Sequence, residues 1–368
     1  MNILHLEASP GWGGQEIRIL REAEGMRSRG HQVILGVMEQ GKLIDEGCKA
    51  GFTTHPLNFH KSGWLPCLIQ ILSLIRQHRI DVVNTHSSLD AWIGGVAARI
   101  ARRPVVRTRH LSTPIKPGWN SKILYGALAD FVVTTCASIL PMICSQSGKP
   151  EADCRSIPTG VDPKRIAAAD EDGCAAREAL GLKKSDFLVG TACFIRSWKG
   201  VEDFLKAADL LRAVKEIKWV VIGGGHEKPY RQMAREMKLD GIVQFTGHLE
   251  NPFPALQALD AFALLSTAHE GVSQAILQAA YLGKPLISTV VGGLNEVCLH
   301  RKTGILVQPF SPDQVARAVL ELLENPGLRS EFGRNGKILV EESFTIGRTI
   351  DEMEQVFTSA IARKSGLF

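Results

Sequence analysis

Short apolar runs alternate with longer segments of helical periodicity along nearly the whole chain, and no other feature of the sequence restricts the fold as strongly. In the first half, the apolar runs that we expect to be strands are residues 3–7, 32–37, 81–85, 104–109 and 131–135. The segments between them place apolar residues at helical spacing. This alternation predicts parallel β-sheets covered by helices on both faces.

The pattern begins again after a polar and alanine-rich stretch at residues 162–184. In the second half the expected strands are residues 187–192, 219–222, 243–245, 261–265 and 285–288. A chain of 368 residues with 45% hydrophobic content can build two such domains. We therefore expect two α/β domains of Rossmann-like, doubly wound type, at residues 1–165 and 166–345. A last helical segment, residues 346–368, is compatible with either half and could pack back on the first.

Export, membrane insertion and metal binding are not indicated. Residues 1–7 lack a basic region before an apolar run and a cleavage site, so we expect a buried first strand rather than a signal peptide. Residues 64–75 come nearest to a membrane span, but Arg76 ends the run short of the ~18 residues required. The eight cysteines are scattered without a CxxC pair, and no histidine cluster has metal spacing. The expectation is a cytoplasmic protein with no resident metal or cofactor.

Charge is distributed unevenly between the halves. Residues 1–165 hold 20 Lys and Arg against 13 Asp and Glu, whereas residues 166–368 hold 23 against 25. The basic half favours an anionic partner, such as a phosphorylated glycan or a membrane surface, although an ordinary solvated basic face explains the count equally well. Several basic residues of this half follow one another closely and form a basic run: Arg99, Arg102, Arg103, Arg107, Arg109, Lys116 and Lys122.

The second half contains a segment suited to phosphate binding, residues 264–285 (LLSTAHEGVSQAILQAAYLGKP). A buried strand ends there in a polar loop, and a helix is expected to begin near Ser273, which is a good N-cap residue. The backbone N–H groups of Ser273, Gln274 and Ala275, together with the helix dipole, would bind a diphosphate. Glu270 precedes the helix, where its carboxylate can accept hydrogen bonds from sugar hydroxyls.

A basic loop, residues 196–200 (RSWKG), follows another expected strand. Arg196 and Lys199 would neutralise the negative charge of a diphosphate without a metal ion. The alternative is that the two cations are a solvated loop pair. Trp198 between them is expected to be a packing residue.

The first half offers candidate contacts at the ends of its strands, where parallel sheets bind their ligands. Gly13 and Gly14 follow the first strand and would let a ligand approach the backbone closely, unless they form only a tight turn. His86 and Ser87 follow a later strand and are placed for acceptor hydroxyls. His110 ends the strand at residues 104–109.

These features together resemble the large retaining glycosyltransferase family 4, because residues 264–285 are similar to its EX7E signature. The other marks occur in the family's order: residues 11–14 (GWGG), His110, 157–162 (IPTGVD), 196–200 (RSWKG), 220–225 (VIGGG), 245–248 (FTGH) and 291–296 (VGGLNE). The resemblance covers nearly the whole chain. It implies the GT-B fold, in which two Rossmann-like domains face each other across a cleft.

The resemblance also implies roles for individual residues. His110 would face the donor sugar at the reaction centre, together with Arg196, Lys199 and Glu270. Donor binding is implied for Gly247 and His248, which would approach the base, and for the segment around the helix start. That segment comprises Gly271, Val272, Ser273, Gln274, Ala275 and Gln278.

Two positions depart from the family's pattern. Gln278 replaces the second glutamate of the signature, which is implied to accept both hydroxyl protons of a ribose; an amide accepts one and donates one. Phe194 occupies the usual position of an arginine five residues before Lys199, and Arg196 lies three residues before it instead.

The resemblance implies that a sugar moves from a nucleotide diphosphate donor to a glycan or lipid-linked acceptor, with retention and without a protein nucleophile. Bacterial surface glycans such as lipopolysaccharide are the expected products, peripheral contact with the membrane is an option, and nucleic acid is not an expected partner. Three alternatives remain at this point. A nicotinamide dehydrogenase is disfavoured because GWGGQE is not a GxGxxG motif. A sugar-nucleotide epimerase on the same fold stays open, as does a catalytically silent binding protein, which Gln278 suggests.

Overall fold

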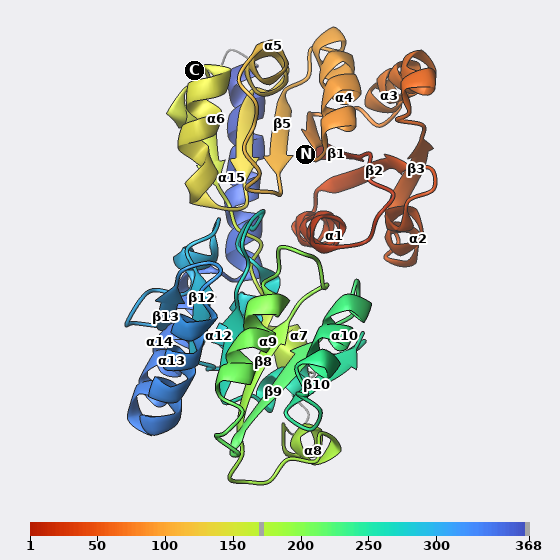
Figure 1. The fold of residues 1–368 in the computed structure, drawn as a ribbon. Helices are drawn as coiled ribbons and strands as arrows, with labels where there is room; N and C mark the ends of the chain where they lie inside the picture. The colour runs from red at the N-terminus through yellow and green to blue at the C-terminus, as the bar shows by residue number, and fades with distance from the viewer. Residues whose placement is uncertain (169–172, 365–368) are drawn as a thin grey trace. The chain divides into compact units, whose positions relative to one another are not determined.

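The computed structural model describes residues 1–168 and 173–364 (Figure 1). The chain divides into two compact units. The first unit comprises Met1–Thr159 and the C-terminal segment that begins at Ile346, and the second comprises Gly160–Thr345. Part of the polar stretch at residues 162–184 lies outside the described residues, and the rest of it belongs to the second unit.

The first unit is built on a parallel sheet of seven strands in the order β3-β2-β1-β4-β5-β6-β7. The strands are β1 (Asn2–Glu7), β2 (Gln32–Met38), β3 (Thr53–Leu57), β4 (Val82–Thr85), β5 (Val105–Arg109), β6 (Phe131–Thr134) and β7 (Cys154–Ser156). All five strands expected from the sequence are present, and the additional strands β3 and β7 form the two edges. The strand order reverses between β1 and β4, which is the point where such sheets bind ligands beyond their carboxyl ends.

Helices cover both faces of this sheet. They are α1 (Gly14–Ser28), α2 (Lys42–Lys49), α3 (Trp64–Gln77), α4 (Ser88–Ile100), α5 (Trp119–Ser121), α6 (Leu140–Ser147) and α15 (Ile346–Lys364). Alternate residues of β1 serve two cores. Ile3 packs in a core that includes Ile19 of α1 and Ile350 of α15. Leu4 packs on the opposite face in a core that includes Ile71 of α3 and Ile93 of α4. The C-terminal helix α15 therefore completes the first core.

The second unit is built on a parallel sheet of six strands in the order β10-β9-β8-β11-β12-β13. The strands are β8 (Phe187–Ala192), β9 (Ile217–Ile222), β10 (Val243–Gly247), β11 (Ala261–Leu264), β12 (Leu286–Thr289) and β13 (Gly304–Val307). The first five match the expected strands, and the edge strand β13 is additional. The strand order reverses between β8 and β11.

The helices of the second unit also lie on both sides of its sheet (Figure 1). They are α7 (Pro163–Ala168), α8 (Gly173–Ala179), α9 (Val201–Leu210), α10 (Lys228–Glu236), α11 (Phe253–Gln257), α12 (Gln274–Tyr281), α13 (Pro312–Glu324) and α14 (Pro326–Ser343). Trp219 of β9 is buried and meets Phe204 of α9 edge to face, with ring centroids 4.9 Å apart. Such contacts hold the helices on the sheet and fix the loops at its carboxyl edge.

All eight cysteines are free. The stretch at residues 64–75 forms most of α3, as expected for a packed helix. Among the described residues, no helix combines the length and the apolar composition needed to cross a bilayer.

Candidate functional site

In the second unit, loops that follow four adjacent strands meet at the carboxyl edge of the sheet. The glycine run after β9 packs against the loop after β8. A Cβ atom on Gly223 would lie 2.2 Å from the carbonyl oxygen of Cys193, and one on Gly225 would lie 2.8 Å from that of Ile195. Both glycines have a φ of +117°, which other residues rarely adopt. The VIGGG segment is therefore glycine-rich because backbone meets backbone there.

Gly200 joins the loop after β8 to the loop after β11. It has a φ of +72°, and a Cβ atom at this position would lie 2.0 Å from the carbonyl oxygen of Leu265. Lys199 precedes it, and its ammonium group forms an ion pair with Glu270 Oε1. Glu270 Oε1 also accepts a 2.7 Å hydrogen bond from the hydroxyl of Ser266. The structure thus brings Lys199 and Glu270 together although they lie in separate loops.

Aromatic rings hold the rest of the basic loop. The guanidinium of Arg196 lies over the rings of Phe194 and Trp198, at 5.3 and 5.2 Å from their centroids. Trp198 also meets the ring of His269 edge to face at 5.4 Å. The carbonyl oxygen of Trp198 accepts a 2.8 Å hydrogen bond from the backbone N–H of Thr267. Trp198 therefore packs between the two loops, and Arg196 stays beside them through its aromatic contacts.

Helix α12 begins where the sequence predicts. Ser273 occupies the N-cap position with extended backbone, although its side chain makes no capping hydrogen bond. Gln274 opens the helix and donates a 3.4 Å hydrogen bond to the carbonyl oxygen of Gly160. Gln278 lies one helical turn further on the same side, and both are half-buried. Gly271 and Val272 lie in the loop between Glu270 and the N-cap Ser273, and Ala275 is the second residue of the helix.

Gly247 and His248 lie at the end of β10, next to the glycine run. The backbone N–H of Gly223 donates a 3.0 Å hydrogen bond to the carbonyl oxygen of Gly247. A Cβ atom on Gly224 would lie 3.3 Å from that of His248. Residues 247–248 thus belong to the same carboxyl edge as Lys199 and Glu270.

In the first unit, the glycine loop forms the start of α1. Gly13 is the N-cap, and its N–H donates a 2.8 Å hydrogen bond to Glu16. A Cβ atom on Gly14 would meet nothing within 4 Å, so the space beside this residue is open. Gly13 and Gly14 are thus a helix start with room beside it, and their contact with an acceptor stays a prediction.

Ser87 caps α4, and this role uses its hydroxyl group. The hydroxyl donates a 3.2 Å hydrogen bond to Asp90 Oδ2, and the Ser87 N–H donates to the same carboxylate. The Ser87 carbonyl oxygen accepts a 2.6 Å hydrogen bond from Arg107. The hydroxyl oxygen of Ser87 is therefore left mainly as an acceptor for any ligand.

His86 and His110 are neighbours at the ends of β4 and β5. The Nδ1 atom of His86 lies 3.0 Å from His110 Nε2, and His86 Nε2 lies 3.0 Å from Nδ1 of His5. His86 is buried, and both of its ring nitrogens are occupied. This arrangement does not favour the direct contact with an acceptor that the sequence predicts for His86. The three rings thus form a hydrogen-bonded chain of histidines, His5–His86–His110. His110 is half-buried and forms the outer end of this histidine chain.

Sequence reasoning missed the inner end of this histidine chain. His5 is completely buried in β1, and its Nε2 atom lies 3.9 Å from Oε1 of Glu22 in α1. Burial, aided by the charge of Arg18, lowers the pKa of His5 to about 3. Burial raises the pKa of Glu22 to about 7, against the opposing effect of Arg18. The available signal was His5, a polar residue within the apolar first strand.

Two more buried carboxyl groups lie at the same edge of the sheet. Glu7 accepts hydrogen bonds from the Ser9 N–H and from the Gln15 side chain. Burial and the nearby charge of Asp90 raise the pKa of Glu7 to about 9. Burial also raises the pKa of Asp90 to about 7, although the Arg107 charge lowers it. The edge beside the glycine loop can therefore hold protons near neutral pH.

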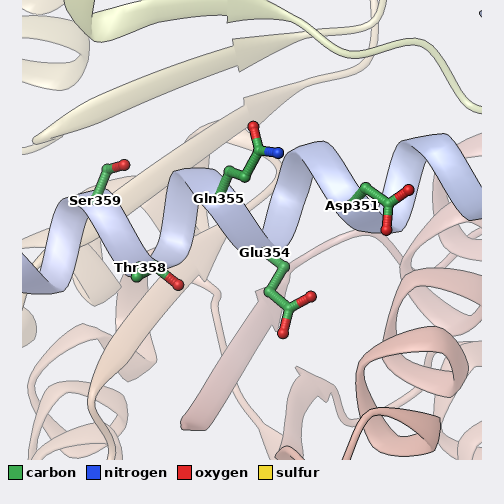
Figure 2. Close-up of a pocket in the computed structure, with 5 residues that line it drawn as sticks. All are labelled: Asp351, Glu354, Gln355, Thr358 and Ser359. Atoms are coloured by element: carbon green, nitrogen blue, oxygen red, sulfur yellow. The ribbon is translucent and has the colours of Figure 1, made fainter.

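A hollow on the surface of α15 is not part of these edges. It is lined by Asp351, Glu354, Gln355, Thr358 and Ser359. Figure 2 shows that these side chains leave the helix on two sides instead of converging on one point. Glu354 is already paired, because its carboxylate lies 2.6 Å from both Arg29 and His31. The hollow lacks the convergent polar groups that a binding site needs.

Among residues 1–168 and 173–364, no group of three or more His, Cys, Asp or Glu side chains is arranged to hold a metal ion. The metal-free chemistry expected from the sequence stays a prediction.

Two family models match the chain, one for each half. The model for Glycosyltransferase Family 4 matches residues 12–165, and the model for Glycosyl transferases group 1 matches residues 175–338. The matched ranges contain most of both carboxyl edges described above, including Gly13, Gly14 and the Lys199–Glu270 pair, whereas Glu7 precedes the first range.

Named relatives and solved structures are similar over nearly the full length. The UDP-Gal:alpha-D-GlcNAc-diphosphoundecaprenol alpha-1,3-galactosyltransferase of Escherichia coli is 25% identical and aligns over 99% of this chain and 98% of its own. HepE from Anabaena, solved in complex with UDP and glucose, has a TM-score of 0.82 at 22% identity, covering 98% of this chain and all of that one. A glycosyltransferase from Rickettsia africae has a TM-score of 0.89 at 18% identity over 98% of both chains. The fold of these structures is thus the fold of this chain.

Proposed function

Because the chain belongs to glycosyltransferase family 4 and has the GT-B fold, we propose that it transfers a sugar from a nucleoside diphosphate sugar to a hydroxyl group of an acceptor. The observation that carries the proposal is the ion pair between Lys199 and Glu270, four residues before α12. A cation, a carboxylate and a helix start at one edge of the sheet suit two parts of such a donor, its diphosphate and its sugar. The ammonium group and the helix dipole attract the diphosphate, and the carboxylate accepts hydrogen bonds from sugar hydroxyls.

The proposed reaction proceeds with retention of configuration at the anomeric carbon. The bond between that carbon and the diphosphate oxygen breaks while the acceptor oxygen attacks from the same face. The hydroxyl proton passes to the departing diphosphate oxygen. Lys199 and Arg196 stabilise the charge on the diphosphate, and His110 contacts the sugar. No covalent protein intermediate is required.

Uridine diphosphate is the first donor nucleotide to test. The solved HepE structure contains UDP, and the E. coli relative is named for a UDP-sugar. That relative is also named for a diphosphoundecaprenol acceptor. A relative from Rhizobium meliloti, 26% identical over 51% of this chain, is named for lipopolysaccharide core biosynthesis. We infer that the acceptor is a lipid-linked or cell-surface glycan precursor.

Because a lipid-linked acceptor lies in a membrane, we also propose that the protein contacts the inner face of the cell membrane. One face of α3 carries Leu65, Ile69 and Arg76. The side chains of Leu65 and Ile69 are 61% and 60% exposed. Trp64 beside them is 38% exposed. Apolar and aromatic side chains with a cation nearby suit the interface of an anionic bilayer. Co-sedimentation with phosphatidylglycerol vesicles tests this, and a Leu65→Glu/Ile69→Glu variant should sediment less.

The activity test is transfer from UDP-, GDP- and ADP-sugars to a lipid-linked acceptor, followed as released nucleoside diphosphate. Lys199→Ala should lower the rate by about 100-fold or more, as expected for loss of a group that stabilises the transition state. Lys206→Ala is the matched control, because Lys206 forms an exposed ion pair with Glu202 in the neighbouring helix. Transfer at the wild-type rate by Lys199→Ala would remove Lys199 from the mechanism. Donor binding without any turnover in the wild type would make the chain a binding protein.

The proposal assigns no cofactor, because Arg196 and Lys199 would neutralise the charge of the diphosphate, which is the role that a metal ion could otherwise have. Transfer should therefore continue in EDTA. Loss of activity in EDTA, restored by Mg²⁺ or Mn²⁺, would contradict this part of the proposal.

A further inference from the structure

Three histidines in the first unit form one hydrogen-bonded chain that runs from the interior to the carboxyl edge of the sheet. His5 lies in β1, His86 follows β4 and His110 follows β5, which are three adjacent strands. The two hydrogen bonds that link them are both 3.0 Å between ring nitrogens. Neutral imidazole carries one N–H and one lone pair, so each ring offers a donor at one nitrogen and an acceptor at the other.

A chain of three neutral rings has only two directions. In one direction all three rings carry the proton on Nδ1, and His110 presents an N–H at its outer nitrogen. In the other direction all three carry it on Nε2, so His110 presents a lone pair and His5 directs an N–H toward Glu22. Among the described residues, no hydrogen bond within the protein reaches His110 Nδ1. The outer nitrogen is therefore available to a ligand in either direction.

The rings are held neutral by their surroundings. Burial lowers the pKa of both His86 and His110 well below the usual value, and the charges of Arg18 and Arg107 act in the same direction. The ring of Phe357 in α15 closes the inner end, meeting His5 edge to face at 6.3 Å. The charged and titratable groups that surround the chain are Arg18 and Glu22 from α1, Arg107 and Arg109 from β5, and Glu7 and Asp90 at the carboxyl edge.

Glu22 is the group that faces the inner end. Its Oε1 atom lies 3.9 Å from His5 Nε2, and both side chains are completely buried. The same oxygen accepts a 3.3 Å hydrogen bond from the amide of Asn84. Asn84 is held in this orientation because its own oxygen accepts a 2.9 Å hydrogen bond from Thr108. An ionised Glu22 therefore attracts an N–H on His5 and repels a lone pair.

We propose that Glu22 and His5 are positioning residues that set the direction of this chain, and thereby decide whether His110 accepts a hydrogen bond from a sugar hydroxyl or donates one to it. With Glu22 ionised, the protons lie on Nε2 and His110 accepts. With Glu22 protonated, the restraint is lost and the Nδ1 form becomes accessible. The role of the sugar hydroxyl rests on the proposed transfer function, whereas the direction of the chain does not.

The direction can be measured directly on the ligand-free, full-length protein. In protein labelled with ¹⁵N-histidine, the nitrogen chemical shifts distinguish the two neutral forms of each ring. Between pH 6 and pH 8.5, the Nε2–H fraction of His5, His86 and His110 should rise together, because the pKa of Glu22 is raised to about 7. Glu22→Gln should abolish this change. Glu24→Gln, at a partly exposed carboxylate that pairs with Arg21 in the same helix, should keep it.

Several results would overturn the proposal. It fails if the wild-type His110 form is constant over this pH range, or if Glu22→Gln changes with pH as the wild type does. Should Glu22→Gln not fold, His5→Gln replaces it, because breaking the chain must also remove the pH dependence from His86 and His110. The wild-type titration decides by itself whether a direction change exists.

A kinetic measurement separates this inference from the proposed function. The wild-type kcat/KM should fall by about tenfold from pH 8.5 to pH 6, which is the size of one hydrogen bond, and the fall should be absent in Glu22→Gln. If the protein transfers sugar but its histidines do not change form, the result contradicts this inference and leaves the proposed function intact. If the histidines change form but the protein does not transfer sugar, the result contradicts the proposed function and leaves the direction change intact.

Discussion

Lys199 and Glu270 form an ion pair across 71 residues of sequence, and their side chains are only 18% and 7% exposed. The pair joins the loops that follow β8 and β11, the two strands between which the order of the second sheet reverses. In parallel sheets this is where ligands bind beyond the strand ends. The pair is thus a charged contact at the edge where sheets of this type bind ligands, as well as a link between two loops.

Removing one partner of this pair should cost stability. In Glu270→Gln, the ammonium group of Lys199 keeps its charge in a largely buried place without a counterion. We expect the free energy of unfolding to fall by about 2 kcal/mol, measured by urea denaturation. Glu202→Gln, which breaks an exposed pair with Lys206, should change it by about 0.5 kcal/mol or less. Equal losses in the two variants would mean that burial of the Lys199–Glu270 pair has no energetic consequence.

Gly200 should tolerate no side chain. Gly200→Ala combines a φ of +72° with a Cβ atom 2.0 Å from the Leu265 carbonyl oxygen, so the two loops must separate. We expect a loss of about 3 kcal/mol or more in the free energy of unfolding, together with loss of transfer. Gly181→Ala is the control: its φ is +66°, but nothing lies within 4 Å, so only the backbone cost of about 1 kcal/mol applies. If the two variants unfold alike, the close approach at Gly200 is not what requires glycine.

The sequence predicts the ten strands that carry most of the two cores and misses three, all at sheet edges. The edge strand β3 (TTHPL) is mostly polar and contains Pro56, and β7 has only three residues, none of them fully buried. An edge strand is bonded on one side and packs against fewer neighbours, so its sequence carries less apolar signal. The third missed strand, β13, is apolar and begins at Gly304, and it is no shorter than β11 and β12, which the sequence predicts.

Site prediction succeeds where a motif is local and fails where the contact is made by tertiary packing. The start of α12 at Ser273 follows from neighbouring residues alone. The chain from Glu22 through His5 to His110 does not, because its members are distributed over α1, β1, β4 and β5. A single histidine in an apolar strand is usually structural, and only the sheet order places these three side by side.

Gln278 should limit donor affinity. If its side chain contacts the ribose, Gln278→Glu exchanges an amide for a charged group that accepts hydrogen bonds from both ribose hydroxyls. We expect the dissociation constant of UDP to fall about tenfold, as measured by isothermal titration calorimetry. The deoxyribose analogue dUDP should gain less, because it lacks one of the two hydroxyls. Weaker binding of UDP by the variant would show that an amide is the better partner here.

Glu7 should make the protein less stable at alkaline pH. Its folded-state pKa is raised from 4.5 to about 9, chiefly by burial and then by the Asp90 charge, so the folded protein holds a proton that the unfolded chain has released. The resulting stability is complete below pH 4.5 and is lost as the pH rises toward 9. Asp90 and Glu22 act in the same direction, but their pKa values are raised only to about 7. Between pH 7.5 and pH 9, Glu7 therefore dominates the contribution of the carboxyl groups.

The test is urea denaturation of the wild type and Glu7→Gln across that range. The free energy of unfolding of the wild type should fall with rising pH, whereas that of Glu7→Gln should fall less steeply. Its amide has no proton to lose, but buried thiols such as Cys193, whose pKa burial raises to about 11, still hold protons that the unfolded chain begins to release. Glu39→Gln, at an exposed carboxylate just after β2, should follow the wild type. A wild-type stability that does not change between pH 7.5 and pH 9 would show that Glu7 is already ionised at neutral pH. In that case the hydrogen bonds from Ser9 and Gln15 outweigh the cost of burying its charge.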